Sequence, residues 1–251
     1  MKETRIDIWD FFTEKVLKTA STDDTTVLWR GQRDPSWPLA SSFERKLLRA
    51  WGLEGAKALP PYDGHPVDEK EIETIAKRRD RLKMLFARAL QGVPDAPRER
   101  PADHRLWALG RHFGLTTPFL DWTRNPYFAA FFALAGSALG TQDVAVYRLE
   151  YRSDLQAAGL RLHEDIWVPE LHRMHRQHGV FTEIDDNFRT FEVEGLCQRT
   201  SGREALHRFV IDKRIAKDAL ADLRAHGLDY HIIYPDLEGA ALYANSQVFG
   251  D

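Results

Sequence analysis

Apolar residues near the start of the chain recur with the period of an α-helix. Ile6, Trp9, Phe12 and Val16 lie three or four residues apart, with charged residues among them. This spacing brings apolar side chains to one face of a helix. Residues 1–20 are therefore predicted to form an N-terminal amphipathic helix.

Six later segments show the same helical period, most with a capping or breaking residue at one end. One of them follows Asn125-Pro126 and is apolar on most sides, so we expect it to run through the core. The six predicted helices are residues 43–51, 70–91, 103–113, 126–139, 213–226 and 237–244.

Shorter stretches rich in β-branched and aromatic residues predict strands. The first is an apolar run that ends at Arg30, and a later one alternates through Val144, Val146 and Leu149. The predicted strands are residues 27–30, 143–151, 181–184, 190–193, 206–211 and 229–234. Because helices and strands are interspersed without a repeat, we predict an α+β fold, a mixed and mainly antiparallel sheet packed with helices.

Two proline-rich loops, residues 59–68 and 93–101, interrupt the first half of the chain. They bound a helical excursion over residues 52–101, and we interpret them as surface loops rather than domain boundaries. A single domain over residues 1–251 is therefore predicted.

Composition is typical of a globular, enzyme-sized protein. Of 251 residues, 43% are hydrophobic and 29% are charged, and the net charge of −3 gives no general attraction to nucleic acid or an anionic membrane. The single Cys197 excludes an intrachain disulfide and a multi-cysteine zinc site. The charged start does not resemble a signal peptide, and the most apolar run, residues 118–139, is too interrupted for a membrane span. We expect a soluble cytoplasmic protein with no membrane partner.

Four motifs follow one another along the chain. They are WRGQ at 29–32 followed by WPL at 37–39, RHFGLTTPFLDWTRNP at 111–126, QHGVFT at 177–182 and YPDLEG at 234–239. Together they resemble the FRG domain family, named for an aromatic-Arg-Gly motif, over residues 28–243. Two departures are that Trp29 stands where the family usually has Phe or Tyr, and that Thr117-Pro118-Phe119 stands where it more often has Thr-Arg-Leu.

The layout of these motifs is similar to that of ADP-ribosyltransferases, which implies NAD as a substrate. A fixed guanidinium suits the pyrophosphate of NAD, and a polar group must stabilise the oxocarbenium-like ribose as nicotinamide leaves. The resemblance implies a cleft between the strand at 27–30, the junction at 120–125 and the segment around Gln177. The implied catalytic residues are Arg30, His112, Asp121 and Gln177, and the implied cofactor-binding residues are Arg30, Gly31, Gln32, Trp37 and Thr123.

Several of these residues also have structural interpretations. Asp121 either orients a ligand-binding group, caps the following helix, or forms a salt bridge with Arg30 or Arg124. His112 either donates to a ligand or simply ends a helix, where an imidazolium is favoured. Thr123 fits a structural role better than a binding role.

Gln177 is an amide and cannot act as a carboxylate base, so a transferase would use another acid such as Glu183. Spacing by threes in His172, His175 and His178 would suit zinc, but the sequence names no fourth ligand, and no metal is predicted.

Two further patterns point to hydrolytic chemistry. Arg173 and His178 have the Arg-x4-His spacing of RNA-cleaving helical toxins, although the predicted strands argue against that all-helical bundle. Asp236 and Glu238 would serve glycoside or phosphoester chemistry, or form a turn in which Asp236 caps the last helix.

The leading prediction is binding of a nucleotide-like small molecule, NAD first, with ADP-ribosyl transfer or NAD cleavage as the chemistry. By analogy, such an activity fits a toxin or phage-defence effector, with a protein or nucleic-acid acceptor and an antitoxin as partners. The alternatives are a non-catalytic domain that senses a nucleotide or a nucleic acid, and a nuclease.

Overall fold

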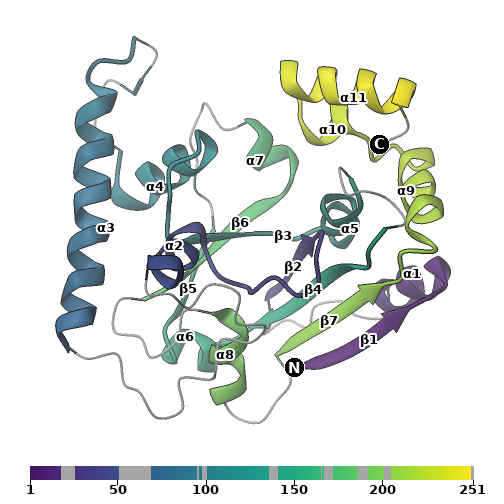
Figure 1. Ribbon diagram of the computed structural model, residues 1–251, viewed down its shortest axis with the longest axis horizontal. Coiled ribbons are helices and arrows are strands. Elements are labelled where there is room, and N and C mark those ends of the chain that lie inside the picture. The colour runs from purple at the N-terminus through teal and green to yellow at the C-terminus, as the bar shows by residue number, and fades with distance from the viewer. Residues whose placement is uncertain are drawn as a thin grey trace.

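The computed structural model describes residues 1–17, 26–50, 69–94, 96–97, 101–135, 141–164, 166, 172–185, 192–200 and 205–249. This part of the chain forms one open seven-stranded sheet packed with helices (Figure 1). The strands are β1 (Lys2–Ile6), β2 (Thr26–Gln32), β3 (Phe119–Thr123), β4 (Val144–Tyr151), β5 (Leu160–His163), β6 (Gly179–Ile184) and β7 (Leu206–Ile211). The helices are α1 (Trp9–Leu17), α2 (Ser42–Ala50), α3 (Glu69–Leu90), α4 (Asp103–His112), α5 (Pro126–Leu134), α6 (Ser153–Ala157), α7 (His172–Arg176), α8 (Val193–Arg199), α9 (Ala216–Ala225), α10 (Tyr230–Ile233) and α11 (Leu237–Phe249).

The strand order is β1-β7-β4-β2-β3-β6-β5. Each neighbouring pair is antiparallel except β1 and β7, which run parallel. The α+β class with a mixed, mainly antiparallel sheet is therefore confirmed. No helix among the described residues is long and apolar enough to cross a membrane.

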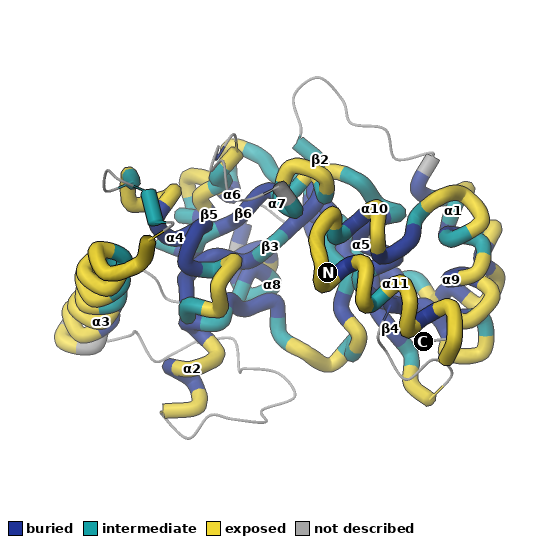
Figure 2. The backbone as a smooth tube through the Cα atoms, turned by 90° about the horizontal axis from the view of Figure 1, so that it is seen from above, coloured by how far each residue is buried: buried dark blue, intermediate teal, exposed yellow. Residues whose placement is uncertain are grey.

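Helices cover both faces of the central strands. On one face, α1, α5 and α9 bury a cluster that includes Trp29 and Phe209. On the other face, α6 and α8 bury Leu28 and Tyr147. Because successive side chains of a strand point to opposite faces, the neighbours Leu28 and Trp29 enter different clusters. Figure 2 shows the buried central strands, whereas much of α3 and α11 is exposed.

Gly31 allows α5 to lie directly against β2. A Cβ atom at this position would meet the carbonyl oxygen of Ala129 at 1.9 Å and the backbone nitrogen of Ala133 at 2.7 Å. No side chain fits between a strand and a helix backbone at that separation. The glycine of the aromatic-Arg-Gly motif therefore has a packing role, in addition to the cofactor-binding role that the resemblance implies.

Most predicted elements are confirmed. The six helices predicted after the N-terminal one correspond to α2, α3, α4, α5, α9 and α11, and α3 lies within the predicted excursion. The strands predicted at 27–30, 143–151, 181–184 and 206–211 correspond to β2, β4, β6 and β7. Residues 51–68, which include the whole of the first proline-rich loop, and 136–139 lie outside the described residues, as do residues 18–20 of the predicted first helix.

The predicted N-terminal helix is wrong for its first residues. Residues 2–6 form β1, and α1 begins only at Trp9. Ile6 is buried because it pairs with Ile211 on β7, far along the chain. Its apolar spacing relative to Trp9 and Phe12 is therefore not a helical period, although all three enter the same cluster.

Two predicted strands are also wrong where the structure describes them. Residues 230–233 form α10, whose first turn is capped by the Asp229 carboxylate accepting from the backbone N–H of Tyr230. Burial of Tyr230 and Ile233, three residues apart, fits a helical turn rather than a strand. Val193 begins α8, while residues 190–191 of that predicted strand lie outside the described part.

Candidate functional site

A pocket of about 400 Å³ lies where β2 and β3 separate. The two strands pair only at Trp29 and Thr123, so the sheet is split beyond that point. The pocket is lined by parts of β2, β3, α4, α5 and the α7–β6 segment, and by Tyr234 after α10. All four predicted catalytic residues, Arg30, His112, Asp121 and Gln177, line it.

Arg30 reaches from β2 towards β3. Its Nη1 donates to the backbone oxygen of Asp121 at 2.7 Å and lies 3.6 Å from the carboxylate. The side chain is 17% exposed, and its buried Nε has no hydrogen-bond partner among the described residues. Burial lowers the pKa of Arg30 to about 10; Arg111 and Arg45 lower it too, while Asp121 opposes the shift. The guanidinium is therefore charged at neutral pH and only partly satisfied.

Arg111, on α4, is the main partner of Asp121. Its Nε donates to Oδ1 at 2.8 Å, and its Nη2 donates to Oδ2. Burial favours the neutral acid, but the guanidinium groups of Arg111 and Arg30 outweigh it and keep the pKa of Asp121 below its usual value. Of the two interpretations of Asp121 as scaffolding, the salt bridge is confirmed with Arg30 and not with Arg124, which pairs with Glu164.

Positive charge exceeds negative charge at this end of the pocket. Asp121 is the only carboxylate among the described lining residues, whereas Arg30 and Arg111 both approach it and the charge of Arg45 repels both arginines. Arg30 Nη2 and Arg111 Nη1 have no hydrogen-bond partner among the described residues. Two guanidinium groups with unused donors beside one carboxylate form a site for an added anion.

A second group of charges lies near α7. Arg173 donates from Nε to Asp236 and from Nη2 to Glu238 at 2.7 Å, and its Cζ lies 5.1 Å from the centre of the Tyr234 ring. Arg173, His112 and Tyr234 all line the pocket. Burial and the charge of Arg173 lower the pKa of His112, so a neutral imidazole is favoured there at pH 7.

Gln177 and Thr123 hold the α7–β6 turn in place. Gln177 Nε2 donates to the carbonyl of Ile233 at 3.1 Å, and Thr123 Oγ1 donates to the carbonyl of Gln177 at 2.6 Å. Thr123 also accepts from the backbone N–H of Asn125. Asn125, not Asp121, caps α5, because its side chain accepts from the first backbone N–H groups of that helix.

Two predicted cofactor-binding residues do not line the pocket. Gln32 is buried beneath the following loop, where Nε2 contacts the carbonyl of Pro38 at 3.5 Å. Trp37 is 52% exposed. Gly31 and Thr123 do line the pocket together with Arg30. Of the WRGQ motif, Trp29, Arg30 and Gly31 therefore line the pocket, whereas Gln32 does not.

Aromatic side chains form much of the remaining wall. Trp29, Phe132, Phe181 and Tyr234 line the pocket, and the rings of Phe132 and Tyr234 meet edge to face at 6.3 Å. Trp122 is fixed through Nε1, which donates to Thr182 Oγ1 at 2.8 Å. Such walls suit a planar ring beside a charged group.

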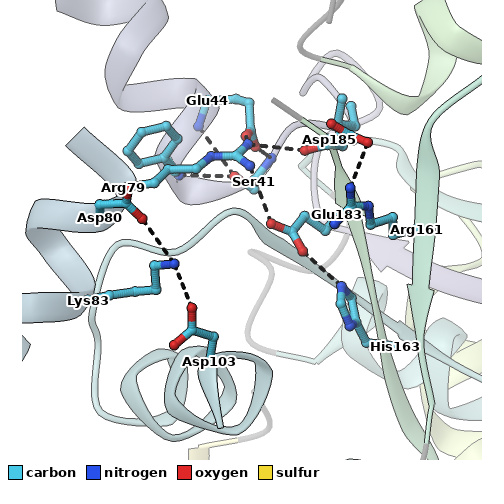
Figure 3. Close-up of polar contacts among 12 residues, drawn as sticks. Ser41, Glu44, Arg79, Asp80, Lys83, Asp103, Arg161, His163, Glu183 and Asp185 are labelled. Atoms are coloured by element: carbon cyan, nitrogen blue, oxygen red, sulfur yellow. Dashed lines mark hydrogen bonds and ion pairs between the residues drawn. The ribbon is translucent and has the colours of Figure 1, made fainter. Parts of the chain in front are cut away.

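Glu183 does not line the pocket, although it was the predicted substitute acid. One of its oxygens accepts from Arg79 at 3.3 Å, and the other contacts His163 at 2.8 Å (Figure 3). Arg79, which is 7% exposed, also donates to Glu44 on α2 at 3.0 Å. These ion pairs connect α3 to α2 and β6, so Glu183 has a structural role.

The described residues give no geometric support to the zinc and ribonuclease hypotheses. Among the described side chains, which do not include that of His172, no group of three His, Cys, Asp or Glu residues is placed to hold a metal. Arg173 is held by two carboxylates, and His178 lies in a turn leading into β6. Asp236 accepts from the backbone N–H of Gly239, which fits the predicted cap of the last helix.

The fold and the site together define an α+β domain with an arginine-lined pocket at a split between two central strands. Residues 25–140 match the FRG domain family, so the chain contains an FRG domain. The matched range includes Arg30, Arg111, His112 and Asp121, whereas Gln177 follows it. Neither the curated proteins nor the solved structures contain a match.

Proposed function

We propose that the pocket binds a nucleotide-like phosphate ester, with NAD as the first ligand to test. The observation that carries this proposal is the approach of Arg30 and Arg111 to the single carboxylate of Asp121, with an unused donor left on each guanidinium. A phosphate supplies several acceptor oxygens, and planar guanidinium groups bind them with charge-assisted hydrogen bonds.

The rest of the lining supports a ligand with a ring. Phe132 and Tyr234 offer aromatic surface in the same pocket as the arginines. A volume of about 400 Å³ lies within the range of small-molecule sites, where apolar walls and a few polar groups fix orientation. A nucleotide combines the ring and the phosphate that these two parts require.

If NAD is turned over, the bond between ribose C1′ and the pyridinium nitrogen breaks and its electron pair neutralises the ring. An acceptor oxygen then bonds to C1′ and loses its proton to solvent. Asp121 would stabilise the developing positive charge on the ribose, since it is ionised and is the only lining carboxylate among the described residues.

A binding domain without turnover is the second candidate, and one observation favours it. Both oxygens of Asp121 already accept hydrogen bonds from Arg111, and Gln177 has no carboxylate. The described lining residues therefore include no carboxylate that is free to act as a base. The same pocket would then sense a nucleotide.

One experiment tests both candidates. NAD, ADP-ribose and AMP are titrated onto the full chain by calorimetry, and free nicotinamide is measured after incubation with NAD. Arg30→Ala is expected to weaken binding about 10- to 100-fold, the usual worth of a hydrogen bond to a charged group. Arg124→Ala is the control, because Arg124 pairs with Glu164 and does not line the pocket.

Nicotinamide release that depends on Arg30 supports a transferase or glycohydrolase. Binding without release supports a sensor. If none of the three ligands binds, or if Arg30→Ala binds them as the original chain does, the pocket does not have the proposed function.

A further inference from the structure

A second hollow, of about 310 Å³, lies between α2 and α3. Its apolar part consists of Phe43 and Leu47 from α2 and Leu82 and Leu85 from α3; its cations are Lys46, Arg78 and Arg81, and Thr116 completes the lining. Among the described residues, no acidic side chain lines it. We call this hollow the α2–α3 groove.

The three cations of the α2–α3 groove form no ion pair within the described part of the chain. Other cations of α3 are paired: Lys77 with Glu73, and Lys83 with Asp80 and Asp103. The groove is therefore a local excess of positive charge on a chain whose net charge is −3.

The walls of the groove are held in position before any partner arrives. Arg79 of α3 donates to Glu44 of α2 at 3.0 Å, and its Cζ lies 5.3 Å from the centre of the Phe43 ring. The start of α2 is fixed as well, because Phe43 N–H donates to the carbonyl of Thr117. A preformed site loses less entropy when a ligand binds.

We propose that the α2–α3 groove docks an acidic, amphipathic segment of a partner protein. Apolar side chains of that segment would pack on Leu47, Leu82 and Leu85, and its carboxylates would pair with the surrounding cations. This combination is the charge and shape complement of the lining.

The lining favours such a peptide over nucleic acid. Single-stranded nucleic acid is bound largely by stacking of its bases on aromatic side chains, and the only aromatic residue among the described lining residues of the groove, Phe43, is 3% exposed. Leu85, by contrast, is an exposed aliphatic side chain beside the cations, which suits an apolar anchor.

A displayed library of random dodecapeptides tests the proposal. Peptides that bind the full chain are selected, and peptides that also bind the triple variant Lys46→Glu/Arg78→Glu/Arg81→Glu are removed. The enriched peptides are expected to combine Asp and Glu with Leu, Ile or Phe at helical spacing. A synthetic enriched peptide, followed by fluorescence anisotropy, should bind the triple variant at least about 10-fold more weakly and lose affinity as salt rises.

Two controls distinguish the loss of peptide binding at the groove from a general effect of net charge and from misfolding. Lys2→Glu/Lys213→Glu/Lys217→Glu makes the same change in net charge on β1 and near α9, and should bind the peptide normally. Leu85→Asp should lose binding while keeping the circular dichroism spectrum of the original chain.

Four results would overturn the proposal. The selected peptides could lack acids, or bind the triple variant undiminished. A single-stranded oligonucleotide could compete at the same three cations more strongly than the peptide, which would make the surface a nucleic-acid site. Concentration-dependent self-association lost in the triple variant, without peptide binding, would make it a contact between copies.

Discussion

Arg111 binds both carboxylate oxygens of Asp121 from the end of α4. Arg30 instead donates to the backbone carbonyl of Asp121 and lies 3.6 Å from its side chain. The carboxylate therefore holds Arg111 firmly and Arg30 loosely. This difference assigns Asp121 a positioning role in anion binding, whatever its part in turnover.

Asp121→Asn should separate positioning from catalysis. The amide keeps the size of the side chain and removes a negative charge from an anion site, so affinity for ADP-ribose is expected to stay equal or rise. If NAD is cleaved, kcat should fall about 100-fold, because the group opposite the developing charge is neutral. Calorimetry and nicotinamide release measure the two effects. Weaker ADP-ribose binding by a folded Asp121→Asn variant would contradict this expectation and would show that the two arginines need the negative charge of Asp121 to stay in place.

The lowered pKa of Asp121 makes stability depend on pH in a definite direction. A carboxyl whose pKa is lower when folded than when unfolded, where it is about 4, stabilises the fold above that unfolded value. This stability is lost as pH falls through the lower, folded pKa. Urea midpoints measured at descending acidic pH should therefore fall less steeply for Asp121→Asn than for the original chain. Parallel curves for the two proteins would exclude a contribution from Asp121.

Local sequence was sufficient for the elements that carry their own pattern. The segments that became α3, α4 and α5 show a helical period or a cap within a few residues, and these elements are where they were predicted. β1 has no such signal, because its strand pairing depends on β7 near the other end of the chain. Short elements such as β5 and α6 were missed for the same reason: tertiary contacts decide them.

The site was predictable to the extent that its residues lie in unusual motifs. Arg30, His112, Asp121 and Gln177 were singled out by sequence, and the fold brings them to one pocket. Arg111 was missed although it directly precedes His112, since nothing local indicates that α4 aims it at β3. Arg173 was considered only as a nuclease residue, because its carboxylate partners lie after the α10 turn.

Asp236→Asn/Glu238→Gln should tighten anion binding. Both carboxylates form ion pairs with Arg173, which lines the pocket. Without them Arg173 gains free donors, and affinity for ADP-ribose is expected to rise about 3- to 10-fold. The oxygen of the introduced amide could still accept from the backbone N–H of Gly239, as the carboxylate of Asp236 does now, so the helix cap is kept. Glu164→Gln, which frees the non-lining Arg124, is the control. Unchanged affinity would place Arg173 outside the binding site.

Gly31→Ala should destabilise the fold strongly. The added Cβ would lie 1.9 Å from the carbonyl oxygen of Ala129, so α5 would have to move away from β2. Overpacking of this kind costs about 3 kcal/mol or more. Gly92→Ala is the matched control, because its Cβ would meet nothing closer than 3.8 Å. Urea denaturation of the pair measures the difference; equal midpoints would show that α5 is not held by this contact.

Arg79→Met should reveal how α3 is attached to the rest of the domain. Arg79 is buried and bridges Glu44 on α2 and Glu183 on β6. Removing it leaves two carboxylates without their cation, which costs about 3–5 kcal/mol. The additional change of Glu44→Gln and Glu183→Gln should restore part of that loss, since no unpaired buried charge remains. Lys77→Met breaks an exposed pair with Glu73 on the same helix and should change the free energy of unfolding by less than about 1 kcal/mol. Equal effects of the two methionine substitutions would mean that the buried bridge does not anchor α3.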